Sequence, residues 1–453
     1  MVQILEIINS VVWGLPTVVL ILGTGLYFSL KTSFFQFSYF PKALKLFLSK
    51  FKPSAKVQDG VSPYQALCTA LAATVGTGNI AGVAGAVAQG GPGAVFWMWV
   101  CAFFGMVIKC AEASLAVRYS QRSASGENIG GPMYMIEKGL SGRWKPMAYL
   151  YAFFGVVAAF GVGNATQINA VLDGIHAAAA AMHISVNQNT DILIALGLAI
   201  LIGIMLSGGA KQIGKIAEAL VPYASVIYIL LGLGVLVLRM DKIPNAFGSI
   251  FHGAFDPKAV TGGVIGSMFI SCRTGAARGV FTNEAGMGTA SIAHAAAKVN
   301  HPVEQGLMGI MEVFIDTVVI CTVTALVILC SDVQIIYGSD AGAWLTFEAF
   351  SNIYGGWSDI LIAACLVLFA LATVLGWGLY GLRCAQYLFG ERVFPFFVMV
   401  QVITVLLGAL LETGVVWLLA ETVNGLMAIP NLITLILLGP VFFRLIKEYK
   451  STR

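Results

Sequence analysis

Long apolar segments recur along almost the whole of this 453-residue chain, and they limit what it can fold into. A helix needs about 20 mostly apolar residues to cross the roughly 30 Å hydrocarbon core of a bilayer. Eleven such segments are present: 8–30, 64–88, 93–117, 147–171, 190–208, 215–238, 260–285, 304–330, 358–382, 394–412 and 425–446. Charged residues make up only 11% of the chain, against roughly 25% in soluble proteins. The sequence therefore predicts an all-α polytopic membrane protein with one domain, 1–453.

The distribution of basic residues predicts an orientation. The loop 31–63 carries six lysines and one acid, which places it in the cytoplasm and the N-terminus outside. Counting eleven spans from there also puts the basic C-terminal tail in the cytoplasm, whereas a twelfth span at 413–424 would put it outside. The N-terminal segment lacks a basic start and a cleavage site, so we expect 8–30 to be a retained extra helix.

Two of the expected spans contain interruptions. Gly76-Thr77-Gly78-Asn79 interrupts 64–88, and Cys272-Arg273-Thr274-Gly275 with Arg278-Gly279 interrupts 260–285. Each opens a set of five spans, 64–238 and 260–446, and the two sets run in opposite directions. Paired interruptions in two inverted halves are typical of a transporter site near the bilayer midplane. The alternative is that these glycines only permit close helix packing.

The first interruption offers both kinds of backbone group. The N–H groups of the half-helix that starts near Asn79 suit a carboxylate. The carbonyls of Ala72, Thr74 and Val75 suit a sodium ion or an ammonium group. An amino-acid zwitterion needs both, so this segment is the first candidate for a binding site.

Other polar residues inside spans are candidates to complete the site. Asn164 and Gln167 are three apart and are expected on one helix face, as are Thr373 and Trp377, which are four apart. Each of them also has a plain packing or interhelical hydrogen-bonding alternative.

Ionisable residues within membrane spans are rare and usually have a function. Glu312 and Asp316 are expected to carry a proton or to pair with a base. Arg273, Arg278 and Glu284 are expected on the cytoplasmic side of the second interruption, where Arg278 and Glu284 would belong to an inner gate.

Enzyme chemistry has no support in the sequence. The five histidines form no H-E-x-x-H pattern, and there is neither a Walker loop nor a nucleophile elbow. The eight cysteines form no C-x-x-C pair and are expected to be packing residues. We therefore expect no enzyme activity and no bound cofactor or nucleic acid.

Two longer motifs carry a family resemblance. The run from Gly90 to Gly105, GGPGAVFWMWVCAFFG, and the run from Arg278 to Gly288, RGVFTNEAGMG, resemble signatures of the alanine or glycine:cation symporters. That family is similar in fold to the five-plus-five inverted-repeat amino-acid transporters.

The resemblance implies roles for individual residues. The backbone of Thr77 and Gly78 would face the substrate carboxylate, and Asn79 would serve substrate or cation. The carbonyls of Ala72 and Val75 and the hydroxyl of Thr373 would bind sodium. The full expected set is Thr77, Gly78, Asn79, Gln167, Cys272, Gly275 and Trp377 for the substrate and Ala72, Thr74, Val75, Asn79 and Thr373 for the cation.

The resulting hypothesis is a symporter of the cell membrane that takes up alanine or glycine with sodium by alternating access. Its partners would be those solutes and the lipid bilayer, with no required protein partner. Proton coupling through Asp316 or Glu312 is the main alternative. A channel and an intramembrane enzyme are the other classes, and paired inverted interruptions favour neither.

Overall fold

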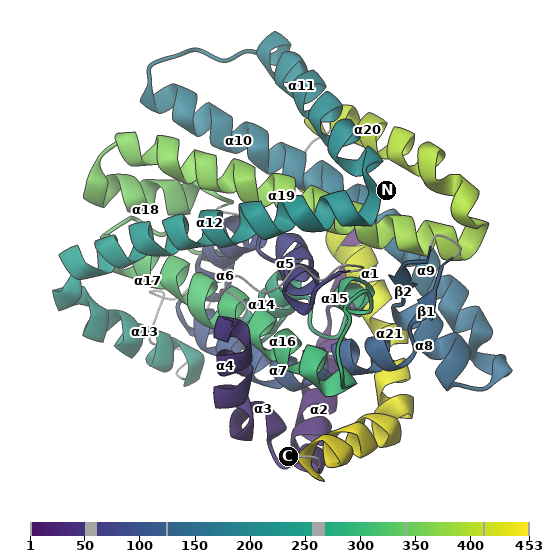
Figure 1. The fold of residues 1–453 in the computed structure, drawn as a ribbon. Helices are drawn as coiled ribbons and strands as arrows, with labels where there is room; N and C mark the ends of the chain where they lie inside the picture. The colour runs from purple at the N-terminus through teal and green to yellow at the C-terminus, as the bar shows by residue number, and fades with distance from the viewer. Residues whose placement is uncertain are drawn as a thin grey trace.

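The structure is a computed structural model that describes residues 2–49, 61–123, 126–255, 268–339, 342–410 and 413–451 (Figure 1). Almost every element in these ranges is a helix. The first half contains α1 (Val2–Val12), α2 (Leu15–Thr32), α3 (Phe35–Ser38), α4 (Phe40–Ser49), α5 (Pro63–Thr74), α6 (Val83–Gly90), α7 (Gly93–Arg118), α8 (Pro132–Gly139), α9 (Lys145–Phe160), α10 (Thr166–Ala181), α11 (Gln188–Ser207) and α12 (Gly209–Leu238). The second half contains α13 (Ile243–Phe255), α14 (Met268–Asn283), α15 (Thr289–His294), α16 (Pro302–Val313), α17 (Thr322–Cys330), α18 (Trp344–Tyr354), α19 (Trp357–Phe389), α20 (Phe394–Leu410) and α21 (Thr413–Ser451).

Shorter elements join these helices. Strands β1 (Gln121–Arg122) and β2 (Asn128–Ile129) form an antiparallel pair after α7. Three 3-10 turns and three π-helical turns complete the set: Gly142–Trp144, Met240–Lys242 and Glu391–Val393, and Gly78–Gly82, Gly161–Ala165 and Phe314–Cys321.

Membrane-spanning length is confirmed for most of the expected segments. Nine helices of the described residues are long and apolar enough to cross a bilayer, and α5 with 78–90 makes a tenth if this bent pair is one span. The remaining expected span, 260–285, lies partly outside the described residues, and its described part is α14. The apolar stretch 413–424 belongs to the same continuous helix as 425–446, so it is not a separate span.

The two ends of the chain pack against each other. Helix α21 contacts both α1 and α2, and Lys450 Nζ near its end donates a hydrogen bond to the Thr32 carbonyl at 3.1 Å. At the other end of α21, Trp13 Nε1 donates to the Glu421 carbonyl at 2.7 Å. The N-terminal segment, predicted to be an extra helix, therefore packs along α21 and is hydrogen-bonded to it near both ends.

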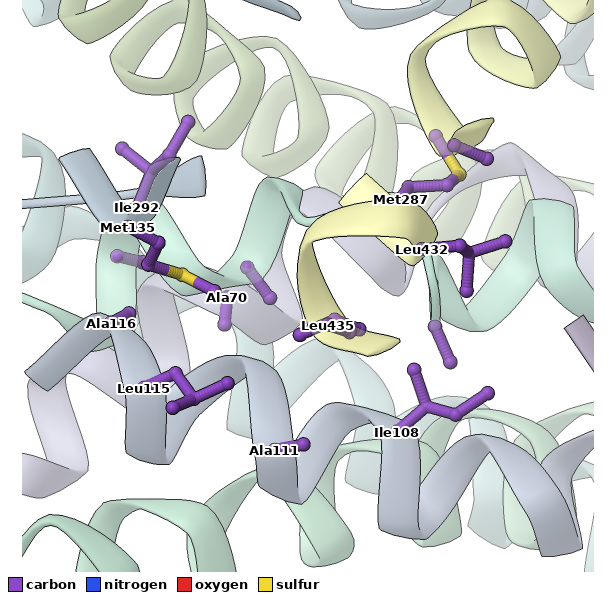
Figure 2. Close-up of a cluster of buried hydrophobic side chains, with 14 of the residues drawn as sticks. Ala70, Ile108, Ala111, Leu115, Ala116, Met135, Met287, Ile292, Leu432 and Leu435 are labelled. Carbon is purple, nitrogen blue, oxygen red and sulfur yellow. The ribbon is translucent and has the colours of Figure 1, made fainter. Parts of the chain in front are cut away.

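Helix α7 forms the centre of the fold. It packs against α14 and α16, and its face made by Ile108, Ala111 and Leu115 lies in the core with Leu432 and Leu435 of α21 (Figure 2). Spacings of three and four residues put such side chains on one helix face. The core around α7 thus supports the segment between α14 and α15, which is described next.

Candidate functional site

The first interruption is a true break in the helix. Helix α5 ends at Thr74, the chain bends by 53°, and a π-helical turn over Gly78–Gly82 starts the second half. Val75 leaves helical geometry at φ −78° and ψ 94°, which turns its carbonyl away from the α5 axis. The position predicted from Gly76-Thr77-Gly78-Asn79 is confirmed.

Polar groups at this break are left without partners. Within the described residues, the Thr77 and Gly78 N–H groups have no hydrogen-bond acceptor, and the buried Thr77 Oγ1 has no partner either. Buried polar groups without partners are rare, because each costs about 1–3 kcal/mol. These groups therefore suit a polar ligand.

Asn79 connects the break to a helix far away in the sequence. Its Oδ1 accepts the Gly76 N–H at 2.9 Å, and its Nδ2 donates to Asp316 Oδ1 at 2.7 Å and lies 3.3 Å from Cys321 Sγ. Asp316 Oδ2 also accepts the Thr317 hydroxyl at 2.7 Å. Asn79 is completely buried, and its hydrogen bonds hold the backbone of the break at Gly76.

Two predicted residues from other helices meet the break at Gly76. A Cβ built on Gly76 would lie 2.5 Å from Thr373 Oγ1 and 3.6 Å from Gln167 Oε1, so only glycine permits this approach. Gln167 Nε2 donates to the Val162 carbonyl at 3.0 Å, whereas its buried Oε1 has no partner among the described residues. Thr373 donates to the Phe369 carbonyl and keeps its oxygen lone pairs free to accept.

The expectation that Asn164 shares a face with Gln167 is wrong. Asn164 Nδ2 donates to the Gln401 carbonyl of α20 at 3.0 Å, and the Asn169 amide likewise bonds the Gly408 carbonyl of α20. The π-helical turn over Gly161–Ala165 inserts an extra residue and rotates the following residues. Of Asn164, Gln167 and Asn169, only Gln167 approaches Gly76 of the break.

Trp377 of α19 packs against Gly163 and is hydrogen-bonded to Glu284, which follows α14. A Cβ on Gly163 would lie 2.2 Å from Trp377 Cβ, and the buried indole Nε1 donates to Glu284 Oε1 at 2.8 Å. Glu284 Oε2 accepts the Thr289 hydroxyl. Glu284 therefore fixes the position of Trp377 and does not pair with Arg278.

The second break lies elsewhere than predicted. Helix α14 continues without interruption through 272–279 and ends at Asn283, and the break is the segment 284–288 before α15. Gly275 instead allows α14 to pack on α7, because a Cβ there would lie 2.2 Å from the Ala94 carbonyl oxygen. Cys272 and Gly275, chosen for a break at 272–279, are thus inside a helix, and Gly275 faces α7.

The N–H groups of the second break are all bonded, unlike those of the first. Glu284, Ala285 and Met287 donate to acceptors within 280–284, and Gly286 and Gly288 donate to Glu112 Oε1 at 3.0 and 2.9 Å. The two breaks are therefore chemically unequal.

Arg278 lies beside segments that the charge pattern predicts to be extracellular. Its Nη1 pairs with Glu421 Oε1 at 2.5 Å, and both side chains line a cavity of about 370 Å³ that Gln89 and Gly338 also border. Gln89 and Gly338 belong to segments that the charge pattern predicts to be extracellular, and the inner gate expected of Arg278 and Glu284 stays a prediction. Phe281 closes this cavity toward the first break, since its Cδ1 is 3.6 Å from the Cβ position of Gly78.

The structure contains a buried charged cluster of Lys109, Glu312 and His294 that the sequence analysis did not predict. Lys109 Nζ lies 3.2 Å from Oε1 of Glu312. The other carboxylate oxygen of Glu312, Oε2, is 2.9 Å from His294 Nε2. Glu312 therefore pairs with a base, as expected. Lys109 and Glu112, three residues apart in an otherwise apolar span, were the signal that could have found this cluster.

A bent span with partners from α10, α19 and the π-helical turn Phe314–Cys321, together with a second, unequal break, is the arrangement of a membrane transporter with broken helices. The fold agrees: MhsT in complex with L-phenylalanine aligns with a TM-score of 0.60 over 86% of this chain and 99% of that one, at 14% identity. The chain belongs to the sodium:alanine symporter family, whose model matches residues 1–453.

Relatives in this family carry different substrate names. The sodium/alanine symporter AgcS of Methanococcus maripaludis is 44% identical over 100% of this chain and 98% of its own. The probable sodium/glutamine symporter GlnT of Bacillus subtilis is 35% identical over 99% of this chain and 91% of its own. The protein is therefore a multi-pass, sodium-coupled amino-acid symporter and not an enzyme.

Proposed function

We propose that this protein takes up alanine or glycine together with sodium by alternating access. The observation that carries the proposal is the set of unpartnered groups at the first break. The Thr77 and Gly78 N–H groups and Thr77 Oγ1 are hydrogen-bond donors for a carboxylate, and Gln167 Oε1 is an acceptor for an ammonium group. Hydrogen-bonding partners for both the carboxylate and the ammonium group of an amino acid therefore lie near Gly76.

A small substrate side chain follows from the surroundings of this position. Trp377 is completely buried, held by Glu284 on one side and backed by Gly163 on the other. A side chain fixed in this way cannot move aside without losing its hydrogen bond. This supports alanine or glycine over substrates with long side chains.

The proposed sodium site consists of neutral oxygens. The Ala72 and Val75 carbonyls lie at the end of α5, and Thr373 Oγ1 approaches the adjacent Gly76. Such oxygens, at the carboxyl end of a half-helix, suit a cation. The Thr74 hydroxyl donates to the Ala70 carbonyl of its own helix and keeps its oxygen lone pairs, so both this oxygen and the Thr74 carbonyl are candidates for this role.

Alternating access supplies the remaining part of the proposal. The Arg278–Glu421 pair lines the cavity, and Phe281 lies between the cavity and Gly78 of the first break, so these three residues would form the outer gate. The N-terminus would be extracellular and the C-terminus cytoplasmic, as the charge pattern predicts. Helices 64–238 and 260–446 would be the two inverted repeats.

Uptake of labelled alanine into proteoliposomes tests the proposal. An inward sodium gradient should drive accumulation, and unlabelled glycine should compete better than glutamine. Accumulation without any effect of sodium would contradict the coupling. Better competition by glutamine than by glycine would contradict the substrate.

Proton coupling is the second candidate, because Asp316 is buried directly behind Asn79 of the first break. An inward proton gradient applied in sodium-free buffer separates the two. Accumulation under that gradient alone, abolished in Asp316→Asn, would assign coupling to Asp316 in place of the neutral oxygens.

A further inference from the structure

Glu112 of α7 is a completely buried carboxylate that the transport proposal does not use. Its Oε1 accepts three hydrogen bonds: from the N–H groups of Gly286 and Gly288 and, at 2.7 Å, from Nδ2 of Asn431. Asn431 Nδ2 also donates to the Gly286 carbonyl at 2.9 Å. All of these bonds link α7 and α21 to the segment 284–288.

The backbone of this segment needs support from outside. Glu284, Gly286 and Gly288 have φ values of 54°, 94° and 80°, in the left-handed region. Such a run cannot form the helical hydrogen-bond ladder, and left-handed geometry at the non-glycine residue is unfavourable. Hydrogen bonds from N–H groups to a carboxylate are stronger than neutral ones, so Glu112 is suited to stabilise this conformation.

The arrangement resembles ligand binding at a break, with the ligand supplied by the protein. At the first break, two N–H groups are without partners in the described part of the chain, whereas at the second break the N–H groups of Gly286 and Gly288 bind Glu112. Lys109, one turn earlier on the same helix face, pairs with Glu312. The cluster therefore holds the carboxylate between the backbone of the second break and a buried ion pair.

We propose that Glu112 is a positioning residue: a built-in carboxylate that fills the second break and fixes 284–288, so that Glu284 stays against Trp377. Its effect on substrate choice rests on the proposed function. Its effect on the backbone of 284–288 does not, and can be measured without any substrate.

Hydrogen–deuterium exchange of the purified full-length protein in nanodiscs tests the backbone effect. In Glu112→Ala, the peptide covering 284–288 should exchange at least about tenfold faster, because two amides lose their acceptor. The peptide covering 75–79 should be unchanged. Glu112→Gln keeps an oxygen acceptor and should stay near the wild type, as should the control Glu137→Ala, whose carboxylate is exposed.

Formate distinguishes a carboxylate site from general damage. The Glu112→Ala change leaves a space of about carboxyl size, so added formate should slow exchange at 284–288 again, while methylammonium should not. Unchanged exchange in Glu112→Ala, equal acceleration at 75–79, or no effect of formate would each overturn the proposal. If Glu112→Ala does not fold, Glu112→Asp replaces it and should give an intermediate acceleration confined to 284–288.

The transport measurement comes last. Glu112→Ala should raise the KM for alanine about tenfold, and formate should restore it, because freeing Glu284 loosens Trp377. A wild type that does not transport alanine would sink the proposed function and leave the exchange result standing. Faster exchange with an unchanged KM would overturn the link to Trp377.

Discussion

Asn79 and Asp316 form a direct hydrogen bond, with Nδ2 of the amide 2.7 Å from Oδ1 of the carboxylate, although they are 237 positions apart in the sequence. The same amide accepts the Gly76 N–H through Oδ1. One side chain thus sets the shape of the first break and links it to the π-helical turn Phe314–Cys321.

Replacing Asn79 should therefore abolish transport. Asn79→Ala leaves the Gly76 N–H and Asp316 without their partner, at about 1–3 kcal/mol for each orphaned group. Asn79→Asp keeps an acceptor but places a second carboxylate against Asp316. Uptake per folded transporter should fall at least about tenfold in both, since a tenfold loss needs only about 1.4 kcal/mol. Wild-type uptake in either would remove the first break from the site; Asn352→Ala, at an exposed residue, serves as the control.

The close approach at Gly76 gives a prediction with a matched control on the same broken span. A Cβ in Gly76→Ala would lie 2.5 Å from Thr373 Oγ1, whereas one in Gly85→Ala has nothing within 4 Å. Overpacking of this kind costs about 1–3 kcal/mol. Uptake should be lost in the first variant and retained in the second, and equal uptake in the two would contradict the contact.

The hydroxyl of Thr373 should set the sodium dependence. Thr373→Val removes the oxygen with little change in volume, and the sodium concentration for half-maximal uptake should rise about tenfold, as for the loss of one ligand worth about 1.4 kcal/mol. Thr373→Ser keeps the hydroxyl and should stay close to the wild type. A sodium titration in proteoliposomes decides this, and superimposable curves for Val and wild type would exclude Thr373 as a ligand.

The outer gate can be tested by exchanging its charges. Arg278 and Glu421 are 17% and 22% exposed, so the pair is largely screened from solvent. Arg278→Glu and Glu421→Arg each place like charges together and should impair uptake, and the double variant should recover a part of it. Absence of recovery, measured as a double-mutant cycle, would show that the two residues act separately.

Much of the architecture was predictable because apolar length is a local property. The expected spans overlap the long helices, although several helices extend well beyond them, and Gly76-Thr77-Gly78-Asn79 marked the first break correctly. The same reasoning failed at the second break. A glycine inside a helix signals either a break or close packing, and Gly275 packs against α7.

The candidate site was predictable in composition but not in pairing. Gln167 and Thr373 were chosen for polarity within spans, and both approach Gly76. The roles of Asn164 and Glu284 depended instead on which helix lies opposite. Helical periodicity could not show that a π-helical turn would direct Asn164 toward Gln401.

The sequence by itself determined that this chain crosses a membrane many times, that its first broken helix exposes backbone groups, and which family signatures it carries. These follow from the hydrophobic cost of exposing long apolar segments and from the conformational freedom of neighbouring glycines. Only the tertiary structure decided where the second break lies and that Glu112 fills it. Its hydrogen bonds join residues 174 and 176 positions apart, and such contacts form only when α7 packs beside the end of α14.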